Sequence, residues 1–442
     1  NHWMGEKLLI TYIKDGYLID PASGIEGHFD LLIKDKKVWK VANKLNLEDL
    51  NVTADKVIDG SGKFIMPGFI DLHVHLREPG YEYKETILSG GKAAAAGGFT
   101  TICAMPNTKP ALDSVEVITS VITSAKNAPV NVYPIAAITK GQEGTLLNDI
   151  AKLIDSGAIA ISEDGKSVLD SGLYAKAMRQ AAKLGIVVFA HCEDSALAAD
   201  GVMNEGRKSK ELGLPGISNG VEDIITARDI ILSKETGAKL HLCHCSTKGS
   251  TYMLDKAKEC GLNVTGETCP HYFILSDEDI PGDDGNYKMN PPLRAKEDVE
   301  AIKEALKNDI LDVIATDHAP HSKEEKDQTM LKAPFGIVGL ETAFSLTWTE
   351  LVKTGILTYK QVVEKMSVNP AKILGIDRGC IGEGYEADIV IIDPDVEYFI
   401  DKNKFFSKGS NTPFHNRKVC GRVLYTIVSG DVKYEYREGL YD

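Results

Sequence analysis

Short apolar runs rich in β-branched residues recur through the middle of this 442-residue chain. They lie at residues 69–74, 99–105, 130–137, 157–162, 185–190, 238–243, 262–266 and 311–315. Helix-compatible stretches, such as 83–96 and 170–184, separate them. Eight strands that alternate with helices over about 250 residues are typical of a (β/α)₈ barrel of the TIM type, in which the chemistry sits at the C-terminal ends of the strands.

The two ends of the chain show a different pattern. Strand-like pieces lie at 8–12, 16–19, 30–33, 37–41 and 56–59, and again, after a helix-like stretch at 359–374, at 387–392, 422–429 and 431–434. We therefore expect both ends to pair into one small β-sandwich. The expected domains are 4–65 with 375–442 for the sandwich, 66–374 for the barrel, and 1–3 as a tag remnant.

Composition excludes several classes of protein. The chain has 64 acidic and 50 basic residues and no Lys/Arg run, which argues against a nucleic-acid-binding surface. No stretch approaches the roughly 18 apolar residues needed to span a bilayer. Eight cysteines are too sparse for a disulfide scaffold, so we expect reduced thiols and a cytoplasmic location.

Residues with ligand chemistry collect where the apolar runs end. Alternate side chains of a strand share one face, so His73 and His75 point the same way and can hold one divalent ion. His271 and His318 follow the seventh and eighth apolar runs. Taken singly, each is more typical of a hydrogen-bonded polar residue than of a metal ligand. The predicted metal ligands are His73, His75, Asp164, His191, His244 and Asp317.

This ligand set predicts two metal ions. Four imidazoles and two carboxylates exceed what one tetrahedral zinc ion needs, so we expect Asp164 to be shared between two ions. Two cations lower the pKa of a bridging water and create a hydroxide nucleophile near neutral pH, while Asp317 could accept the proton and return it to a leaving nitrogen. Cys243 and Cys245 are expected to be small buried residues.

Several motifs resemble the amidohydrolase superfamily and, more closely, dihydroorotases of the bacterial class I type. They are HVHLREPG at 73–80, EYKET at 82–86, AAAGGFTT at 94–101, MPNT at 105–108, KMNPPLR at 288–294, ATDHAPH at 315–321 and PFG at 334–336. The DHAPH segment is shared with allantoinases and hydantoinases, whereas LREPG at 76–80 and MNPP at 289–292 are more discriminating. The resemblance runs from about residue 60 to the C-terminal β region.

The resemblance implies an activity and a set of roles. That family interconverts N-carbamoyl-L-aspartate and L-dihydroorotate, the ring-closing step of pyrimidine synthesis, with two zinc ions. One ion would be held by His73, His75, Asp164 and Asp317, and the other by His191 and His244 with Asp164 bridging. The implied substrate contacts are Arg77, Asn107 and His321 to the carboxylate, and Asn290 with backbone groups near Phe335 and Gly336 to the ring's amide edge.

The resemblance also implies partners. A homodimer is the family expectation, and some relatives associate with aspartate transcarbamoylase, although no segment of this chain identifies that partner. No nucleic-acid or membrane partner is expected.

Two alternatives stay open at this point. The segment TGETCPHY at 265–272 resembles allantoinases and hydantoinases, so the protein could instead be a cyclic amidase of the allantoinase, hydantoinase or dihydropyrimidinase type. Those relatives bridge their metals with a carboxylated lysine, a role for which Lys166 is the available residue. A catalytically inactive scaffold paralogue is the weakest hypothesis, because such proteins commonly lose metal ligands and every expected ligand is present here.

Overall fold

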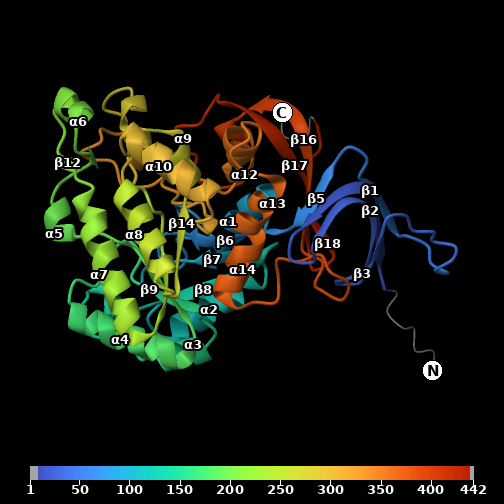
Figure 1. Ribbon diagram of the computed structural model, residues 1–442, viewed down its shortest axis with the longest axis horizontal. Coiled ribbons are helices and arrows are strands. Elements are labelled where there is room, and N and C mark those ends of the chain that lie inside the picture. The colour runs from blue at the N-terminus through green and yellow to red at the C-terminus, as the bar shows by residue number, and fades with distance from the viewer. Residues whose placement is uncertain (1–7, 439–442) are drawn as a thin grey trace.

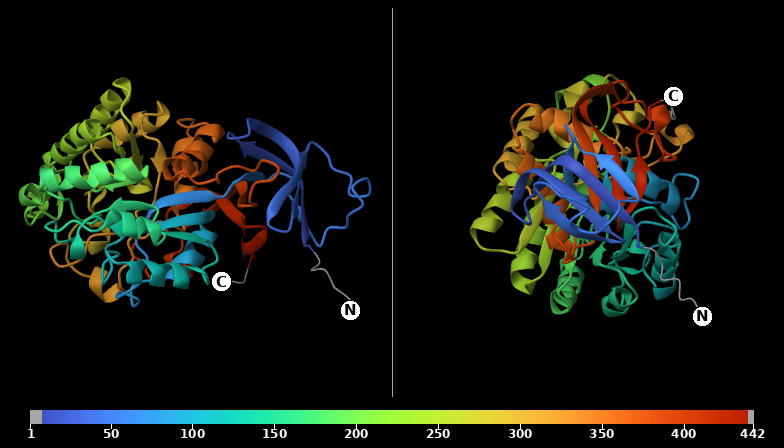
Figure 2. Two further views of the ribbon diagram at one scale, coloured as in Figure 1. Left: turned by 90° about the horizontal axis from the view of Figure 1, so that it is seen from below. Right: turned by 90° about the vertical axis from the view of Figure 1, so that its right-hand side faces the viewer.

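The barrel expected from the apolar runs is present. The computed structural model describes residues 8–438 (Figures 1 and 2). Parallel strands neighbour one another in chain order: β6 (Phe69–Val74), β7 (Phe99–Ala104), β8 (Asn131–Ala137), β9 (Ala160–Ser162), β10 (Val187–Ala190), β13 (Lys239–Leu242), β14 (Val264–Thr268) and β15 (Val313–Ile314). A parallel bridge between Val74 and His318 joins the last strand end to the first and closes the ring.

Helices follow these strands on the outside of the barrel. They are α1 (Ile87–Ala96), α2 (Val115–Ala125), α3 (Ile150–Asp155), α4 (Ser171–Leu184), α7 (Gly220–Thr236), α8 (Lys248–Glu259), α10 (Lys296–Lys307) and the continuous run α13 (Tyr359–Val363), η5 (Glu364–Val368) and α14 (Asn369–Leu374). The expected helix at 83–96 begins at Ile87 because the Thr86 side chain caps it. Within residues 8–438, no helix is both long and apolar enough to cross a bilayer.

Shorter elements fill the connections between strands and helices. They are η1 (Lys140–Gln142), α5 (Ser195–Ala198), β11 (Met203–Asn204), α6 (Arg207–Leu212), β12 (Gly216–Ile217), α9 (Pro270–Ile274), η2 (Asp277–Asp279), η3 (Gly285–Tyr287), α11 (Lys323–Lys326), α12 (Ala343–Thr347), η4 (Trp348–Val352) and η6 (Lys402–Lys404). Most of them follow strand ends, where a barrel carries its functional loops.

Both chain ends form one mixed sheet beside the barrel (Figure 2). Its strands are β1 (Ile10–Asp20), β2 (Ile25–Lys34), β3 (Lys37–Ala42), β4 (Lys56–Asp59), β5 (Phe64–Pro67), β16 (Ile389–Phe399), β17 (Lys418–Val428) and β18 (Asp431–Glu435). Residues from strands at both sides of this sheet share one apolar core, so the sheet curls around it. This confirms the expected β domain built from the two ends; residues 1–3, the expected tag remnant, lie outside the described residues.

The sequence pattern and the sheet differ in one respect. The sequence pattern predicts two separate strands at 8–12 and 16–19, because the alternation of apolar residues is interrupted between them. The structure has one strand there, β1. A register shift between Ile13 and Gly16 interrupts its pairing with β2, and Asp15 there has a φ of 56°. Such a bulge breaks the alternation of side chains without ending the strand.

The β domain is fastened to the barrel by an aromatic cluster. Trp348 has no exposed surface, and its indole Nε1 donates to the carbonyl oxygen of Pro394 in β16 at 3.0 Å. Its ring stacks on Tyr359 with 5.4 Å between centroids and meets Phe64 edge-on at 5.7 Å. Chain segments far apart in sequence therefore pack as one unit around this ring.

Candidate metal centre

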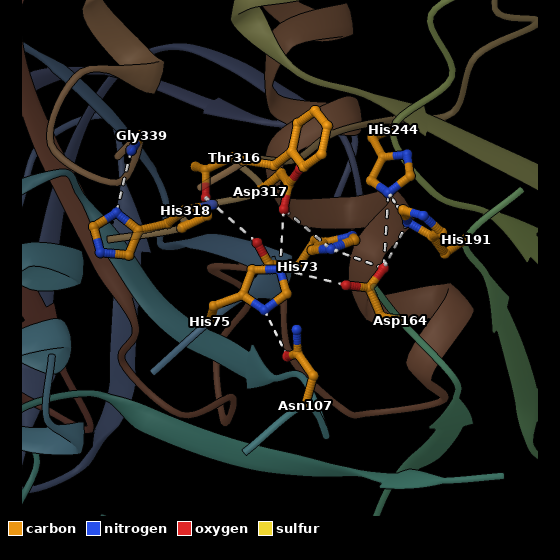
Figure 3. A network of polar contacts seen from close by, with 12 residues as sticks. His73, His75, Asn107, Asp164, His191, His244, Thr316, Asp317, His318 and Gly339 are labelled. Carbon is orange, nitrogen blue, oxygen red and sulfur yellow. Dashed lines mark hydrogen bonds and ion pairs between the residues drawn. The ribbon is translucent and has the colours of Figure 1, made fainter. Parts of the chain in front are cut away.

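All six residues expected to bind metal meet at the C-terminal end of the barrel (Figure 3). His73 lies in β6 and His75 follows that strand, whereas the other four follow β9, β10, β13 and β15. Each of the six is at most 9% exposed. The barrel fold thus brings residues that span 245 positions of the sequence, from His73 to Asp317, into one cluster.

The first half of the cluster joins His73, His75, Asp164 and Asp317. His73 Nε2 lies 3.3 Å from Asp164 Oδ1 and 3.3 Å from Asp317 Oδ1. His75 Nε2 lies 3.4 Å from Asp164 Oδ2 and 3.1 Å from Asp317 Oδ1. Both imidazoles therefore direct the same nitrogen toward the same pair of carboxylates.

The second half consists of His191 and His244. Their facing nitrogens, His191 Nδ1 and His244 Nε2, are 2.9 Å apart. These two atoms lie 3.5 and 3.7 Å, respectively, from Asp164 Oδ1. The two oxygens of one carboxylate consequently border both halves, which is the position required of a shared ligand.

The cluster fits divalent metal ions. Two atoms each about 2.1 Å from one ion at the tetrahedral angle are about 3.4 Å apart, close to the separations of the ligand atoms here. His73 Nε2 and Asp164 Oδ1 are buried and have no hydrogen-bond partner among the described residues. Buried polar atoms of this kind need a partner, and a cation supplies one. Burial acts to raise the pKa of Asp164, but the neighbouring imidazoles hold it well below its ordinary value.

Carboxylates outside the cluster orient the predicted ligands, and sequence reasoning missed them. Glu267 in β14 accepts a hydrogen bond from His73 Nδ1 at 2.8 Å, and Glu193 accepts one from His191 Nε2 at 2.6 Å. Each bond leaves the opposite ring nitrogen with its lone pair toward the centre. For Glu267 a signal was available, because an acidic residue inside an apolar strand needs a buried partner.

Unusual backbone conformations place three functional side chains. Arg77, His244 and Asp317 have φ values of 63°, 32° and 49°, a region that residues other than glycine seldom occupy. All three come directly after strand segments of the barrel. Such conformations persist where the surrounding structure holds them, and they cluster at active sites.

The residues expected to bind the substrate carboxylate surround Arg77. Its Nε donates to the carbonyl oxygen of Pro320 at 3.1 Å and its Nη2 lies 3.3 Å from His321 Nε2, whereas its Nη1 has no hydrogen-bond partner among the described residues. Asn107 Oδ1 accepts from His75 Nδ1 at 2.8 Å, so this residue also orients a ligand. His321 uses both ring nitrogens within the protein: Nε2 donates to Phe335 O at 2.8 Å and Nδ1 accepts from Lys84 Nζ at 3.0 Å.

The residues expected at the ring's amide edge are also held by the protein. Asn290 Nδ2 donates to Glu193 Oε2 at 2.9 Å, which ties it to the ligand His191. The Gly336 N–H donates to Lys288 O and its carbonyl accepts from an asparagine side chain. The roles expected of Phe335 and Gly336 toward substrate therefore stay predictions.

Other candidate residues lie outside the cluster of six. Lys166 is exposed and its Nζ donates to the carbonyl of Gln142 at 3.1 Å. Cys243 and Cys245 are buried as expected, although the Cys243 thiol lies close enough to His73 and Glu267 for the three to form a possible ligand group. His318 is a structural residue: Nε2 contacts Glu85 at 2.9 Å.

The fold and the site together indicate the class of protein. A parallel barrel that carries paired histidines and carboxylates at its C-terminal strand ends is the framework of the metal-dependent amidohydrolases, and comparison with known proteins agrees. The profile of the family described as Dihydro-orotase-like matches residues 62–250. The dihydroorotase of Pelotomaculum thermopropionicum is 48% identical over 420 residues, 95% of this chain and 97% of that protein. The dihydroorotase of Geobacter metallireducens is 48% identical and covers 96% and 99%. The chain belongs to the dihydroorotase family.

Solved structures place the fold among enzymes of cyclic amides. The L-hydantoinase (dihydropyrimidinase) of Arthrobacter aurescens superposes with a TM-score of 0.85 at 26% identity, covering 97% of this chain and 96% of that one. The dihydropyrimidinase of Brevibacillus agri gives 0.82 at 26% identity, covering 96% and 95%. The fold expected from sequence is thus confirmed, and the protein is an enzyme of the metal-dependent cyclic amide hydrolases.

The position of Glu267 generates a prediction about metal affinity. Glu267→Gln should weaken metal binding by roughly 10–100-fold, because the amide keeps the shape but removes the charge that supports His73. Chelator competition would measure it, with Glu259→Gln, at an exposed pair with Lys256, as the matched control. Equal affinity in both folded variants would contradict the orienting role of Glu267.

Proposed function

We propose that the protein catalyses the reversible cyclisation of N-carbamoyl-L-aspartate to L-dihydroorotate in pyrimidine synthesis, with two zinc ions in the described centre. The observation that carries this proposal is Arg77, whose guanidinium is buried beside the cluster and whose Nη1 has no hydrogen-bond partner among the described residues. Both proposed substrates retain a carboxylate that does not react. A guanidinium binds such a group with two parallel hydrogen bonds.

The metal assignment follows the two halves of the cluster. His73, His75 and Asp317 would hold one ion, His191 and His244 the other, and Asp164 would contact both. Bound metal ions would polarise the amide carbonyl and lower the pKa of a water molecule. The residues of the chain then have to hold the substrate and move protons.

Asp317 is proposed to move the proton. Burial acts to raise its pKa, but the imidazoles around it lower the value below that of an ordinary aspartate, so the carboxylate is ionised at neutral pH. Its side chain is 11% exposed, more than those of His73 and Asp164, and lies at the edge of the cluster. In the hydrolytic direction it would accept the proton of the attacking water and deliver it to the ring nitrogen as the C–N bond breaks.

Recognition of the substrate would use groups that also orient ligands. Asn107 and Asn290 each use one end of the side-chain amide in a hydrogen bond within the protein, to His75 and Glu193 respectively. The other ends of the two amides have no hydrogen-bond partner among residues 8–438. Lys84 adds a second cation near the carboxylate site through His321. Burial together with Arg77 and Lys84 lowers the pKa of His321, which would therefore act as a neutral ring.

The remaining properties belong to the same proposal. The barrel of 66–374 would carry catalysis, with 4–65 and 375–442 as the supporting β domain. All eight cysteines are free thiols, which supports a reducing, cytoplasmic setting. A homodimer is proposed on the family resemblance, and association with aspartate transcarbamoylase rests on the same resemblance alone.

A hydantoinase-type activity is the second candidate. The likeness to solved hydantoinases and dihydropyrimidinases and the 265–272 segment favour it. Asp164 at the shared position and the buried Arg77 weigh against it, since hydantoins carry no spectator carboxylate for an arginine. Lys166 points to Gln142 instead of substituting for Asp164.

Substrate choice tests the function directly. The zinc-loaded protein should open L-dihydroorotate and leave allantoin and hydantoin unchanged, measured as steady-state turnover of the three rings in parallel. Turnover of the other rings in place of dihydroorotate would transfer the assignment to the second candidate.

Asp317→Asn tests the proton transfer. Turnover should fall by about 10²–10⁴-fold because the amide cannot accept a proton, while five ligands remain to retain metal. Metal content and kcat would be measured on the same sample. High residual turnover with full metal loading would rule out the proposed role.

Arg77→Met tests carboxylate recognition. Loss of a charged hydrogen bond worth about 1.5–3 kcal/mol should raise the KM for N-carbamoyl-L-aspartate roughly 10–100-fold. Arg179→Met, an exposed position on α4, is the control for loss of a positive charge. An unchanged KM in Arg77→Met would contradict the assignment.

A further inference from the structure

A second cavity lies away from the metal centre and is lined mainly by residues in and around α12, β16 and β17, the elements labelled in Figure 1. It encloses about 200 Å³, enough for a small ligand. No residue of the metal centre and none of the expected substrate contacts lines it. Its aromatic walls include Tyr398, Phe399, Phe405 and Tyr436, and two arginines, Arg422 and Arg437, border the same space.

Arg422 of β17 lies over two aromatic rings. Its guanidinium carbon lies 4.2 Å from the ring centroid of Tyr398 and 4.4 Å from that of Tyr436. Two cation–π contacts restrict the position of the guanidinium and leave N–H groups to bind an acceptor.

Those N–H groups have no acceptor in the described part of the chain. Within residues 8–438, the guanidinium of Arg422 has neither a hydrogen bond nor an ion pair. The other arginines that lie over rings differ: Arg228 is 2.8 Å from Asp229, and Arg417 is 2.6 Å from Glu350. A guanidinium that is pre-oriented and still lacks a carboxylate is a binding element for an anion.

The two acidic residues that line the cavity are each engaged by N–H groups of the protein. Both oxygens of Glu341 accept backbone N–H bonds, from Phe406 at 2.9 Å and Ser407 at 3.0 Å. Burial raises the pKa of Glu341 to about 8, so this wall is largely uncharged at neutral pH. Asp401 uses its carboxylate to cap the turn at Asn403.

We propose that this cavity is a binding site for a small planar aromatic anion, whose ring packs between the aromatic walls and whose negative group pairs with the edge of Arg422. The flat guanidinium and rings select a planar ligand, and the unsatisfied cation selects a negative one. The site is independent of the proposed catalytic function.

Benzoate is the probe, with cyclohexanecarboxylate as a ligand of equal charge that lacks the flat ring. Isothermal titration calorimetry on the full chain should detect benzoate binding in wild type, at least tenfold weaker binding of cyclohexanecarboxylate, and at least tenfold weaker benzoate binding in Arg422→Gln. Lys418→Gln removes a positive charge from the same strand at an exposed pair with Glu397 and should bind benzoate as wild type does. Melting temperatures would verify that both variants are folded.

Several results would overturn the proposal. They are no benzoate binding in wild type, equal binding of the two acids, equal binding in a folded Arg422→Gln, and displacement of benzoate by L-dihydroorotate, which would assign it to the catalytic site. These readouts measure benzoate affinity alone, so a failure of the proposed dihydroorotase activity would not change their interpretation.

Discussion

One buried carboxylate organises the active end of this barrel. The oxygens of Asp164 lie 3.3–3.7 Å from nitrogens of four imidazoles that arrive from three different strand ends. A cluster of ionisable groups without water is unfavourable unless its charges are balanced. Outer carboxylates such as Glu267 and Glu193 orient the imidazoles and add further negative charge, which a bound metal ion would balance. Metal affinity and folding stability are consequently coupled through this one residue.

The cluster depends equally on closure of the barrel. Asp71 in the first strand accepts hydrogen bonds from the backbone and hydroxyl of Thr316, which follows the last strand, at 3.2 and 2.5 Å. That contact lies one residue before Asp317, whose backbone is in the left-handed region. The energy stored in such a conformation has to be offset by surrounding contacts. Closure and catalytic geometry are therefore produced by the same interactions.

Much of this could be predicted from the chain itself. Apolar runs located all eight barrel strands, because each strand is buried on both faces and reads as a continuous apolar segment. The six clustered residues could be predicted because a barrel collects its strand ends. Partner choice could not: nothing in the sequence says that Glu193 would hold both His191 and Asn290, or that His321 would direct its N–H to Phe335. Such pairings depend on loop paths that no local pattern encodes.

The loop between β16 and β17 reaches back to the catalytic end. Asn411 accepts from the backbone of His321 and donates to the carbonyls of Ala319 and Gly336, while Ser407 bonds Glu85, which holds His318. During synthesis on the ribosome, a chain that has emerged as far as residue 400 contains all six residues of the cluster. It does not yet contain Ser407 and Asn411, which make these contacts. These contacts to the catalytic end can therefore form only after residues 407–411 have been synthesised.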